Sequence, residues 1–208
     1  MTNHNGESFI TGYVPIVVAK CGVFLKEKGA DVEGIFRLSG SARRTKDLQE
    51  IFDSPKCYGK DLIWSGYTVH DAANVLRRYL NQLPEPVIPL NFYERFRDPL
   101  QHHQAYAASD VDAKSNFDVQ QVVARYQQLI QKLPPLNQQL LVYILNILAF
   151  FVSKSDQNLM TASNMAVIFQ PSVLSHPSHD MAPEEYKCSQ DVITFLIENQ
   201  EHFLAGMI

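Results

Sequence analysis

The sequence predicts an all-α protein, a single domain built as a bundle of seven to nine helices. Three observations lead to this prediction. Apolar residues recur at three- and four-residue spacings through most of the 208 residues. Prolines and glycines separate these periodic segments, and no convincing strand-like alternation is present. The composition, 46% hydrophobic and 19% charged, is typical of a globular protein that can bury its own core. We therefore take residues 1–208 as one domain, with a core over about 13–204.

The first third of the chain predicts two helices joined by a structured loop. Residues 13–28 place apolar side chains on one helical face, and Gly29 is a plausible end of that helix. The segment 32–40 has no helical period and contains two glycines and β-branched residues, so we expect a loop there. A helix over 42–53 follows and ends before Pro55.

Thr68 is the expected N-cap of the next helix. Asp71 stands three residues later, where a carboxylate can complete a partial capping box. The helix is expected to run to about Gln82, because Pro84 and Pro86 cannot continue it.

The second half of the chain predicts further helices separated by prolines. A short helix over 91–97 is expected to precede a polar loop over 98–116 with at most one helical turn. Prolines 171, 177 and 183 predict an irregular connection. The remaining helices are expected at 117–132, 135–153, 161–170 and 188–203.

Charge and cysteine content exclude several classes of protein. The chain has 18 basic and 22 acidic residues, a net charge of −4, which is untypical of a nucleic-acid-binding protein. Its three cysteines form no CxxC pair, and no secretory signal precedes them, so we expect a reduced, cytoplasmic setting. The most apolar run, 140–152, is too short to cross a bilayer and predicts a buried helix rather than membrane insertion.

No motif of a self-contained enzyme is present. The sequence lacks GxxxxGK[ST], GxGxxG, GxSxG and HExxH. His176 and His179 have a proline between them and no cysteine beside them, so we expect no metal site. Any phosphate chemistry must therefore use a nucleotide that a partner carries, and we expect no cofactor bound by this chain.

The segment GIFRLSG, residues 34–40, is the strongest candidate for a functional loop. Arg37 is the one cation among apolar and small residues. Ile35 and Phe36 can anchor the loop in the core while Arg37 points outward. A guanidinium is planar and always charged, and it binds phosphate oxygens well. The alternative is that Arg37 pairs with a local carboxylate.

A polar stripe on the helix after Thr68 is a second candidate. Asn74, Arg77, Arg78 and Asn81 fall at i, i+3, i+4 and i+7, which places them on one face. Such a stripe can hydrogen-bond a loop or a partner. The alternative is an ordinary solvated face.

Three blocks of sequence resemble the RhoGAP domain, the GTPase-activating module for Rho-family GTPases. GIFRLSG followed by SARRTKDL is similar to its arginine-finger region, VLRRYLNQLPEP to its helix and proline turn, and LMTASNMAVIFQPSVL to its late helix. The blocks occur in the order and spacing of the family, and the resemblance covers nearly the whole chain. The segment after the third block is similar to the fungal branch.

The resemblance implies an activator rather than an enzyme with its own active site. Arg37 would be the arginine finger, inserted in trans into a GTP-bound Rho-family GTPase that itself carries GTP and Mg²⁺. It also implies a monomer that is one domain of a longer protein, recruited to membranes through its partner or through regions outside this chain. The alternative is a module of the same fold that binds GTPases or other proteins without accelerating hydrolysis.

The resemblance also assigns binding or finger-supporting roles, with departures from the family pattern. Arg77 stands where the family usually has Lys, and Asn81 stands where many members have Arg. Asn164 matches the Asn of the late helix. Gln170 replaces a common Gly, and Ser172 replaces a common Asn. These departures make partner affinity and partner choice open questions.

Overall fold

The computed structural model describes residues 14–109, 119–179 and 182–204. Over these ranges the fold is helical and contains no strand, which confirms the all-α prediction. Eight helices have twelve or more residues, and α7 and α10 are single turns of four residues. In chain order the elements are α1 (Ile16–Lys28), α2 (Ala42–Asp53), α3 (Val69–Asn81), the 3-10 turn η1 (Leu90–Phe92), α4 (Tyr93–Ser109), α5 (Val119–Gln131), α6 (Pro135–Val152), α7 (Ser155–Asn158), α8 (Ala162–Val173), the 3-10 turn η3 (Pro177–His179), α9 (Pro183–Glu198) and α10 (Glu201–Leu204).

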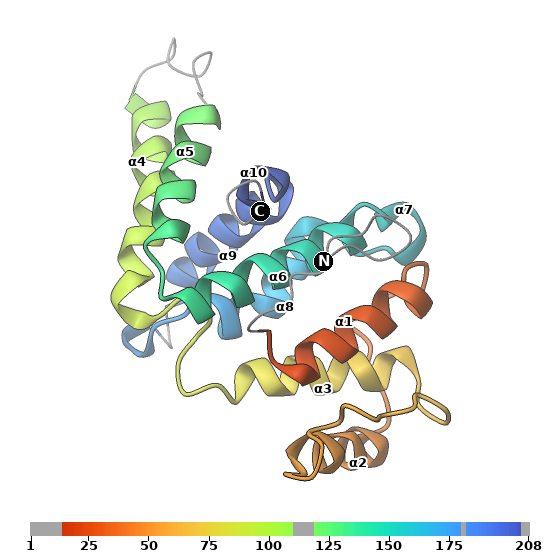
Figure 1. The fold of residues 1–208 in the computed structure, drawn as a ribbon. Coiled ribbons are helices and arrows are strands. Elements are labelled where there is room, and N and C mark those ends of the chain that lie inside the picture. Colours follow the sequence, from red (N-terminus) through yellow and green to blue (C-terminus); the bar gives the residue numbers. More distant parts are fainter. Residues whose placement is uncertain (1–13, 110–118, 180–181, 205–208) are drawn as a thin grey trace.

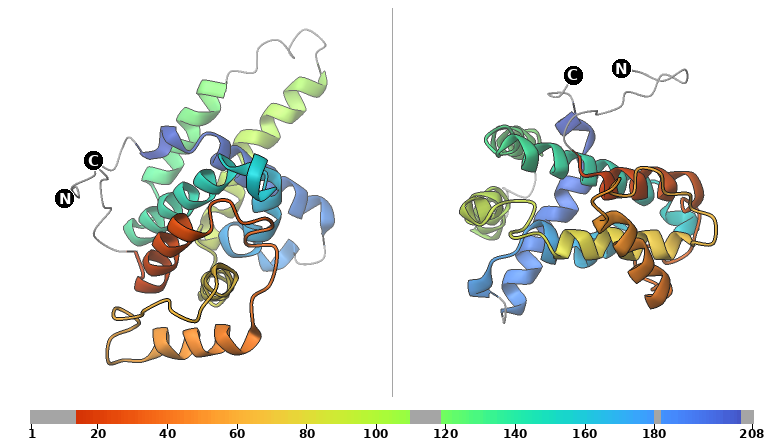
Figure 2. Two further views of the ribbon diagram at one scale, coloured as in Figure 1. Left: turned by 90° about the vertical axis from the view of Figure 1, so that its right-hand side faces the viewer. Right: turned by 60° about the horizontal axis from the view of Figure 1, so that its bottom comes forward.

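Helices α6, α8 and α9 form the centre of the bundle. α6 contacts α1, α8 and α9, and α8 also contacts α3. On one side α1 lies along α3, and α2 packs against the outer face of α3 (Figures 1 and 2). On the other side α4 and α5 form a pair that extends away from the centre (Figure 1). The loop 34–40 therefore lies where α1, α2 and α3 meet the central helices.

Helix α6 is the core helix that its apolar sequence predicts. Among the described residues it is the one helix with the length and hydropathy to cross a membrane. Eight of its side chains are buried against the rest of the protein. Burial of this kind is what the central helix of a globular bundle requires.

The predicted helix starts are confirmed where side chains cap them. Thr68 accepts a hydrogen bond from the backbone N–H of Asp71, and the Asp71 carboxylate accepts one from Thr68, so the capping box is complete. Ser41 caps α2, and Thr161 caps α8. Pro135 stands in the first turn of α6, where its missing N–H would have no partner in any case.

Helix α4 is longer than the sequence predicts. The expected loop from residue 98 is wrong as far as Ser109, and residues 110–116 lie outside the described part. The helix continues through Pro99 because the apolar side chains on both sides of it are held in the core. Phe96 and Leu100, one turn apart, are 0% and 9% exposed. Tertiary packing against α5 and α9 thus overrides the polar sequence and the proline.

Helix α8 extends beyond its predicted end, and the predicted helix over 188–203 is divided into α9, which ends at Glu198, and the separate turn α10. α8 runs through Pro171 to Val173, and α9 begins at Pro183 rather than at residue 188. The carbonyls of Ser172 and Val173 accept hydrogen bonds from the backbone of Val87 and Ile88, at 2.9 and 3.0 Å. The carbonyl groups at the end of α8 therefore find their hydrogen-bond donors in the segment that follows α3, a distant part of the sequence.

Candidate functional site

The loop 34–40 is anchored in the core immediately before Arg37. Ile35 and Phe36 are both 0% exposed. The Phe36 ring contacts Phe151 and Phe169 edge-on, with ring centroids 5.1 and 5.2 Å apart. These contacts fix the backbone directly beneath Arg37 to α6 and α8.

The backbone of this loop turns sharply, so that Arg37 leaves the core. Phe36 has φ 67°, a left-handed conformation that residues other than glycine rarely adopt, and Gly34 has φ 66°. The N–H groups of Arg37 and Leu38 both donate to the Gly34 carbonyl, at 2.9 and 2.8 Å. Left-handed backbone outside glycine costs free energy and persists where the surroundings impose it.

Arg37 is exposed and unpaired. Within the described residues its side chain has no hydrogen bond and no ion pair. The alternative that Arg37 is neutralised by a local carboxylate is therefore wrong. Its guanidinium is available to an anion presented from outside the molecule.

Arg77 hydrogen-bonds the loop 34–40. Its Nη1 donates to the Phe36 carbonyl at 2.8 Å, and its Nε is buried without a partner. Burial lowers the pKa of Arg77 from its ordinary value, although a guanidinium stays charged at neutral pH. The alternative of an ordinary solvated face is wrong for this residue, since Arg77 bonds the peptide that precedes Arg37.

The remaining side chains of the polar stripe have different environments. Arg78 is exposed and donates to Gln49 Oε1 on α2 at 3.1 Å. Asn81 is exposed and makes no side-chain hydrogen bond within the part of the chain that the structure describes. Of the four stripe residues, Arg77 contacts the loop, Arg78 contacts α2, Asn81 is exposed and Asn74 is half-buried.

Asp71 fixes the far end of the loop. Its fully buried carboxylate accepts from the backbone of Ser41 at 2.8 Å and from Arg44 Nε at 2.6 Å. Burial alone would raise the pKa of Asp71, but the hydrogen bonds from Arg44, Thr68 and Ser41 outweigh it and hold the pKa below its ordinary value. Gly40 is required here, because a Cβ would lie 2.3 Å from Asp71 Oδ1.

The predicted site residues of α8 separate into one surface side chain and two buried ones. Asn164 is partly exposed, and its Nδ2 donates to the Leu159 carbonyl at 3.3 Å. Gln170 and Ser172 are 3% and 5% exposed and donate to the carbonyls of Leu174 and Phe169. Both side chains lie below the surface and bond the end of their own helix, so neither is placed to contact a partner directly, while a finger-supporting role for them stays a prediction.

The sequence analysis missed Asn158. The side chain of Asn158 is 0% exposed and hydrogen-bonds the backbone of Ala30, Phe151 and Met160. The main-chain carbonyl of Asn158 accepts a hydrogen bond from the Gly34 N–H at 2.9 Å. No sequence signal identifies it, because its partners are main-chain groups brought together only by the fold.

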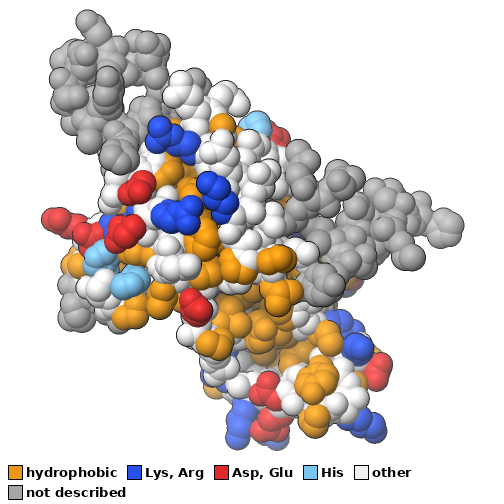
Figure 3. Space-filling model, turned by 60° about the vertical axis from the view of Figure 1, so that its left-hand side comes forward, with side chains coloured by type: hydrophobic (Ala, Val, Ile, Leu, Met, Phe, Trp, Pro, Cys, Tyr) orange, Lys and Arg blue, Asp and Glu red, His pale blue; other side chains and the backbone are white. Residues whose placement is uncertain are grey.

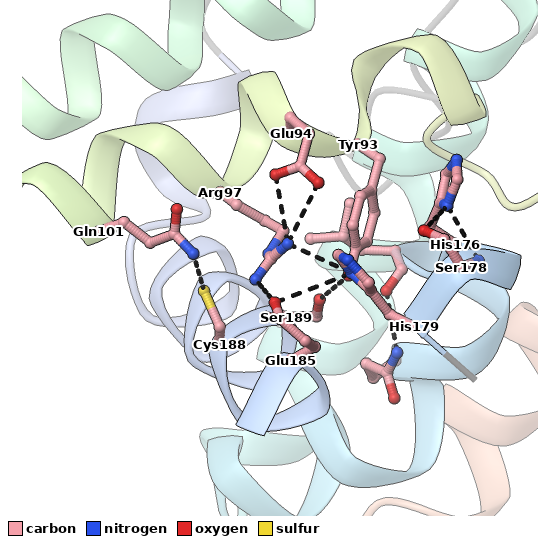
Figure 4. A network of polar contacts seen from close by, with 12 residues as sticks. Tyr93, Glu94, Arg97, Gln101, His176, Ser178, His179, Glu185, Cys188 and Ser189 are labelled. Atoms are coloured by element: carbon pink, nitrogen blue, oxygen red, sulfur yellow. Dashed lines mark hydrogen bonds and ion pairs between the residues drawn. The ribbon is translucent and has the colours of Figure 1, made fainter. Parts of the chain in front are cut away.

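A second polar cluster lies on the opposite side of the molecule, where α4, η3 and α9 meet (Figures 1 and 4). Arg97, 3% exposed, bonds Glu94 and Glu185 and lies over the Tyr93 ring. Tyr93 in turn contacts His179 Nδ1 at 3.0 Å. Arg97 is thus already occupied by carboxylates and joins helices, in contrast to Arg37.

Surface charge does not single out another site on this side. Figure 3 shows acidic, basic and histidine side chains intermixed, with hydrophobic atoms between them. Within the described residues, no group of three or more His, Cys, Asp or Glu side chains is arranged to hold a metal ion.

The comparisons with known proteins identify the family. A family model described as the RhoGAP domain matches residues 15–178. The chain belongs to the RhoGAP domain family. It is 46% identical over 204 residues to Rho-GTPase-activating protein 5 of Schizosaccharomyces pombe, covering 98% of this chain and 53% of that protein. It is 42% identical over 187 residues to Rho-GTPase-activating protein BAG7 of Saccharomyces cerevisiae, covering 89% and 44%. The predicted similarity to the fungal branch is confirmed.

Solved structures of the family share the fold. The BH domain of GRAF, the GTPase regulator associated with focal adhesion kinase, superposes with a TM-score of 0.73 at 26% identity, covering 90% of this chain and 93% of that one. Human Rho GTPase activating protein 15 superposes with a TM-score of 0.75 at 21% identity, covering 91% and 83%. The chain spans about half the length of the fungal relatives, so it corresponds to one part of proteins of that kind.

The contact between Arg77 and the loop predicts a difference between neighbouring arginines. Arg77→Met keeps the apolar stem but removes the donor to Phe36, so we expect the free energy of unfolding to fall by about 1–3 kcal/mol. Arg78→Met, on the exposed side of the same turn, is the matched control and is expected to stay within about 0.5 kcal/mol of the parent. Urea denaturation followed by circular dichroism measures both. Equal losses would show that the Arg77 contact adds no stability.

The lowered pKa of Asp71 predicts a pH-dependent contribution to stability. The ionised carboxylate stabilises the fold above the unfolded pKa of about 3.9, and the contribution is lost as pH falls toward the lower folded value. Asp71→Asn is expected to destabilise by about 1–3 kcal/mol at pH 7, with the difference from the parent shrinking below about pH 4. Urea denaturation at a series of pH values measures it, with the exposed Asp61→Asn as control. A difference independent of pH would contradict the assignment.

Proposed function

We propose that this chain accelerates GTP hydrolysis by a Rho-family small GTPase, with Arg37 inserted in trans into the partner's nucleotide site. The observation that carries the proposal is the exposed, unpaired guanidinium of Arg37 on a loop fixed from beneath by buried Phe36. Membership of the RhoGAP family and the names of the fungal relatives support the same function.

The chemistry that Arg37 supplies is electrostatic. Charge spreads over the γ-phosphoryl oxygens as the bond to the leaving phosphate breaks, and a guanidinium donates parallel hydrogen bonds to such oxygens. The partner holds GTP and Mg²⁺ and positions the attacking water, so this chain needs no nucleotide site. An arginine finger is worth about 10³–10⁵ in rate, or roughly 4–7 kcal/mol of barrier.

The anchoring of the loop makes this contribution efficient. Arg77 and Phe36 fix the backbone before Arg37, and Asp71 fixes the backbone at Ser41 after it. Only the side chain of Arg37 then has to be ordered when the partner docks. Preorganisation of this kind lowers the entropy lost on reaching the transition state.

Exposed apolar side chains next to the finger are suited to contact the partner. Leu38 is 48% exposed and Leu159 51%. Leu38 follows Arg37 directly, and Leu159 follows the residue whose carbonyl bonds Gly34. A few such side chains around a charged anchor are typical of the centre of a protein interface. We assign this surface, with Asn164, to binding of the GTPase.

The competing function is binding without acceleration. Three departures from the family pattern, Asn81, Gln170 and Ser172, motivate it, yet Gln170 and Ser172 are buried and of the three only Asn81 is exposed. The exposed Arg37 favours acceleration.

Substitution of Arg37 tests the proposal. Arg37→Ala is expected to remove most of the acceleration, about 10³-fold or more, because the transition-state charge loses its donor. Binding to the GTP-bound partner should change by only a few-fold. Single-turnover GTP hydrolysis by purified Rho-, Rac- and Cdc42-type GTPases, with this chain in excess, measures the rate.

Arg95→Ala is the matched control, since Arg95 is an exposed arginine on α4 that lies over the Phe92 ring, away from the loop. It should retain the parent rate. Equal rates for Arg37→Ala and the parent would refute the finger. A parent that binds the GTP-bound protein but leaves its turnover unchanged would instead establish the binding module.

A further inference from the structure

Asn158 is a fully buried amide whose hydrogen bonds join three segments of the bundle. Its Nδ2 donates to the carbonyl of Ala30, just after α1, at 3.0 Å, and to that of Phe151, near the end of α6, at 2.8 Å. Its Oδ1 accepts from Met160 N–H, before α8, at 2.8 Å. Only a carboxamide provides two donors and an acceptor in this arrangement.

The backbone of Asn158 connects the same point to the finger loop. Its carbonyl accepts from Gly34 N–H at 2.9 Å, and the Gly34 carbonyl in turn accepts from the N–H groups of Arg37 and Leu38. The path from the buried amide to the backbone of Arg37 therefore consists of two successive main-chain hydrogen bonds. Ala30, which the amide also holds, lies at the other end of the short segment between α1 and the loop.

The conformation of the following residue also depends on this amide. Leu159 has φ 60°, and its side chain is 51% exposed. A left-handed leucine with an exposed side chain is unfavourable by itself, so the surrounding contacts must impose it. The bond from Met160 to Asn158 Oδ1 spans Leu159 and closes that turn.

We propose that Asn158 is a positioning residue for the reaction, which fixes the register of the finger loop against α6 and α8 and thereby places Arg37. The inference rests on the proposed function of Arg37. Asn158 touches neither the partner nor the nucleotide, and it acts through Gly34. A shift of about 1 Å in a reacting group lowers rates by about 100-fold, so a loosened loop would slow hydrolysis while the docking surface persists.

Two substitutions test this role. Asn158→Asp has nearly the same shape and keeps the acceptor for Met160 but loses both donors; Asn158→Ala removes all three bonds without burying a charge. We expect both to lower the maximal rate of GTP hydrolysis at saturating concentration of the chain by about 10- to 100-fold. The concentration giving half-maximal rate should change by less than about threefold, because Asn158 is not part of the surface.

A control that loses a buried hydrogen bond elsewhere in the bundle separates positioning from general destabilisation. Tyr126→Phe removes a buried hydrogen bond to the Phe96 carbonyl, between α5 and α4 and away from the loop. Assays run well below the melting temperature of each variant should give the parent rate for Tyr126→Phe. In the Arg37→Ala background, the Asn158 substitutions should have no further effect, since they act only through Arg37.

The measured rates distinguish failure of the positioning role of Asn158 from failure of the proposed function. A parent chain without acceleration would overturn the proposed function itself. If the parent accelerates hydrolysis and Arg37→Ala does not, parent-like rates for both Asn158 variants would overturn only the positioning role. Loss of the folded state in both variants, or a further loss of rate in the Arg37→Ala background, would also overturn it, because Asn158 would then support the whole fold.

Discussion

The burial of Phe36 is the constraint on which the position of Arg37 depends. A fully buried ring, held between Phe151 and Phe169, sits directly before an exposed guanidinium. The backbone at Phe36 is left-handed, a conformation that costs free energy and persists where the surroundings impose it. The apolar contacts of the ring offset that strain, and they hold the loop to the core from which the guanidinium projects.

Three polar residues hold the backbone of the loop at different positions. Arg77 bonds the peptide at Phe36, Asp71 bonds the backbone at Ser41, and Asn158 bonds Gly34 through its own carbonyl. Arg77 and Asp71 both lie on α3, and Asn158 ends α7, so two separate elements fix the loop at its start, its middle and its end. Two arginines differ in this respect: Arg97 is buried among carboxylates and joins helices, whereas Arg37 has no ion pair with any residue that the structure describes.

Local sequence was sufficient wherever the determining contacts are local. The capping box of Thr68 and Asp71, the starts of α2 and α8, and the apolar α6 all follow from residues within a few positions of one another. It was insufficient at α4 and at the end of α8. There, prolines and polar residues favour a break, and packing or hydrogen bonds from distant segments keep the helix intact.

In the candidate site, too, some features follow from local sequence and others from contacts between distant segments. The sequence by itself determined the fold class, the family resemblance and the candidate finger Arg37, because a lone cation in an apolar segment between two glycines is a local pattern. Only the tertiary structure decided that Arg37 is unpaired, that Arg77 faces the loop, that Gln170 and Ser172 are buried, and that Asn158 belongs to the site. The physical reason is that these properties depend on main-chain groups far apart in sequence, whose meeting is set by how the helices pack.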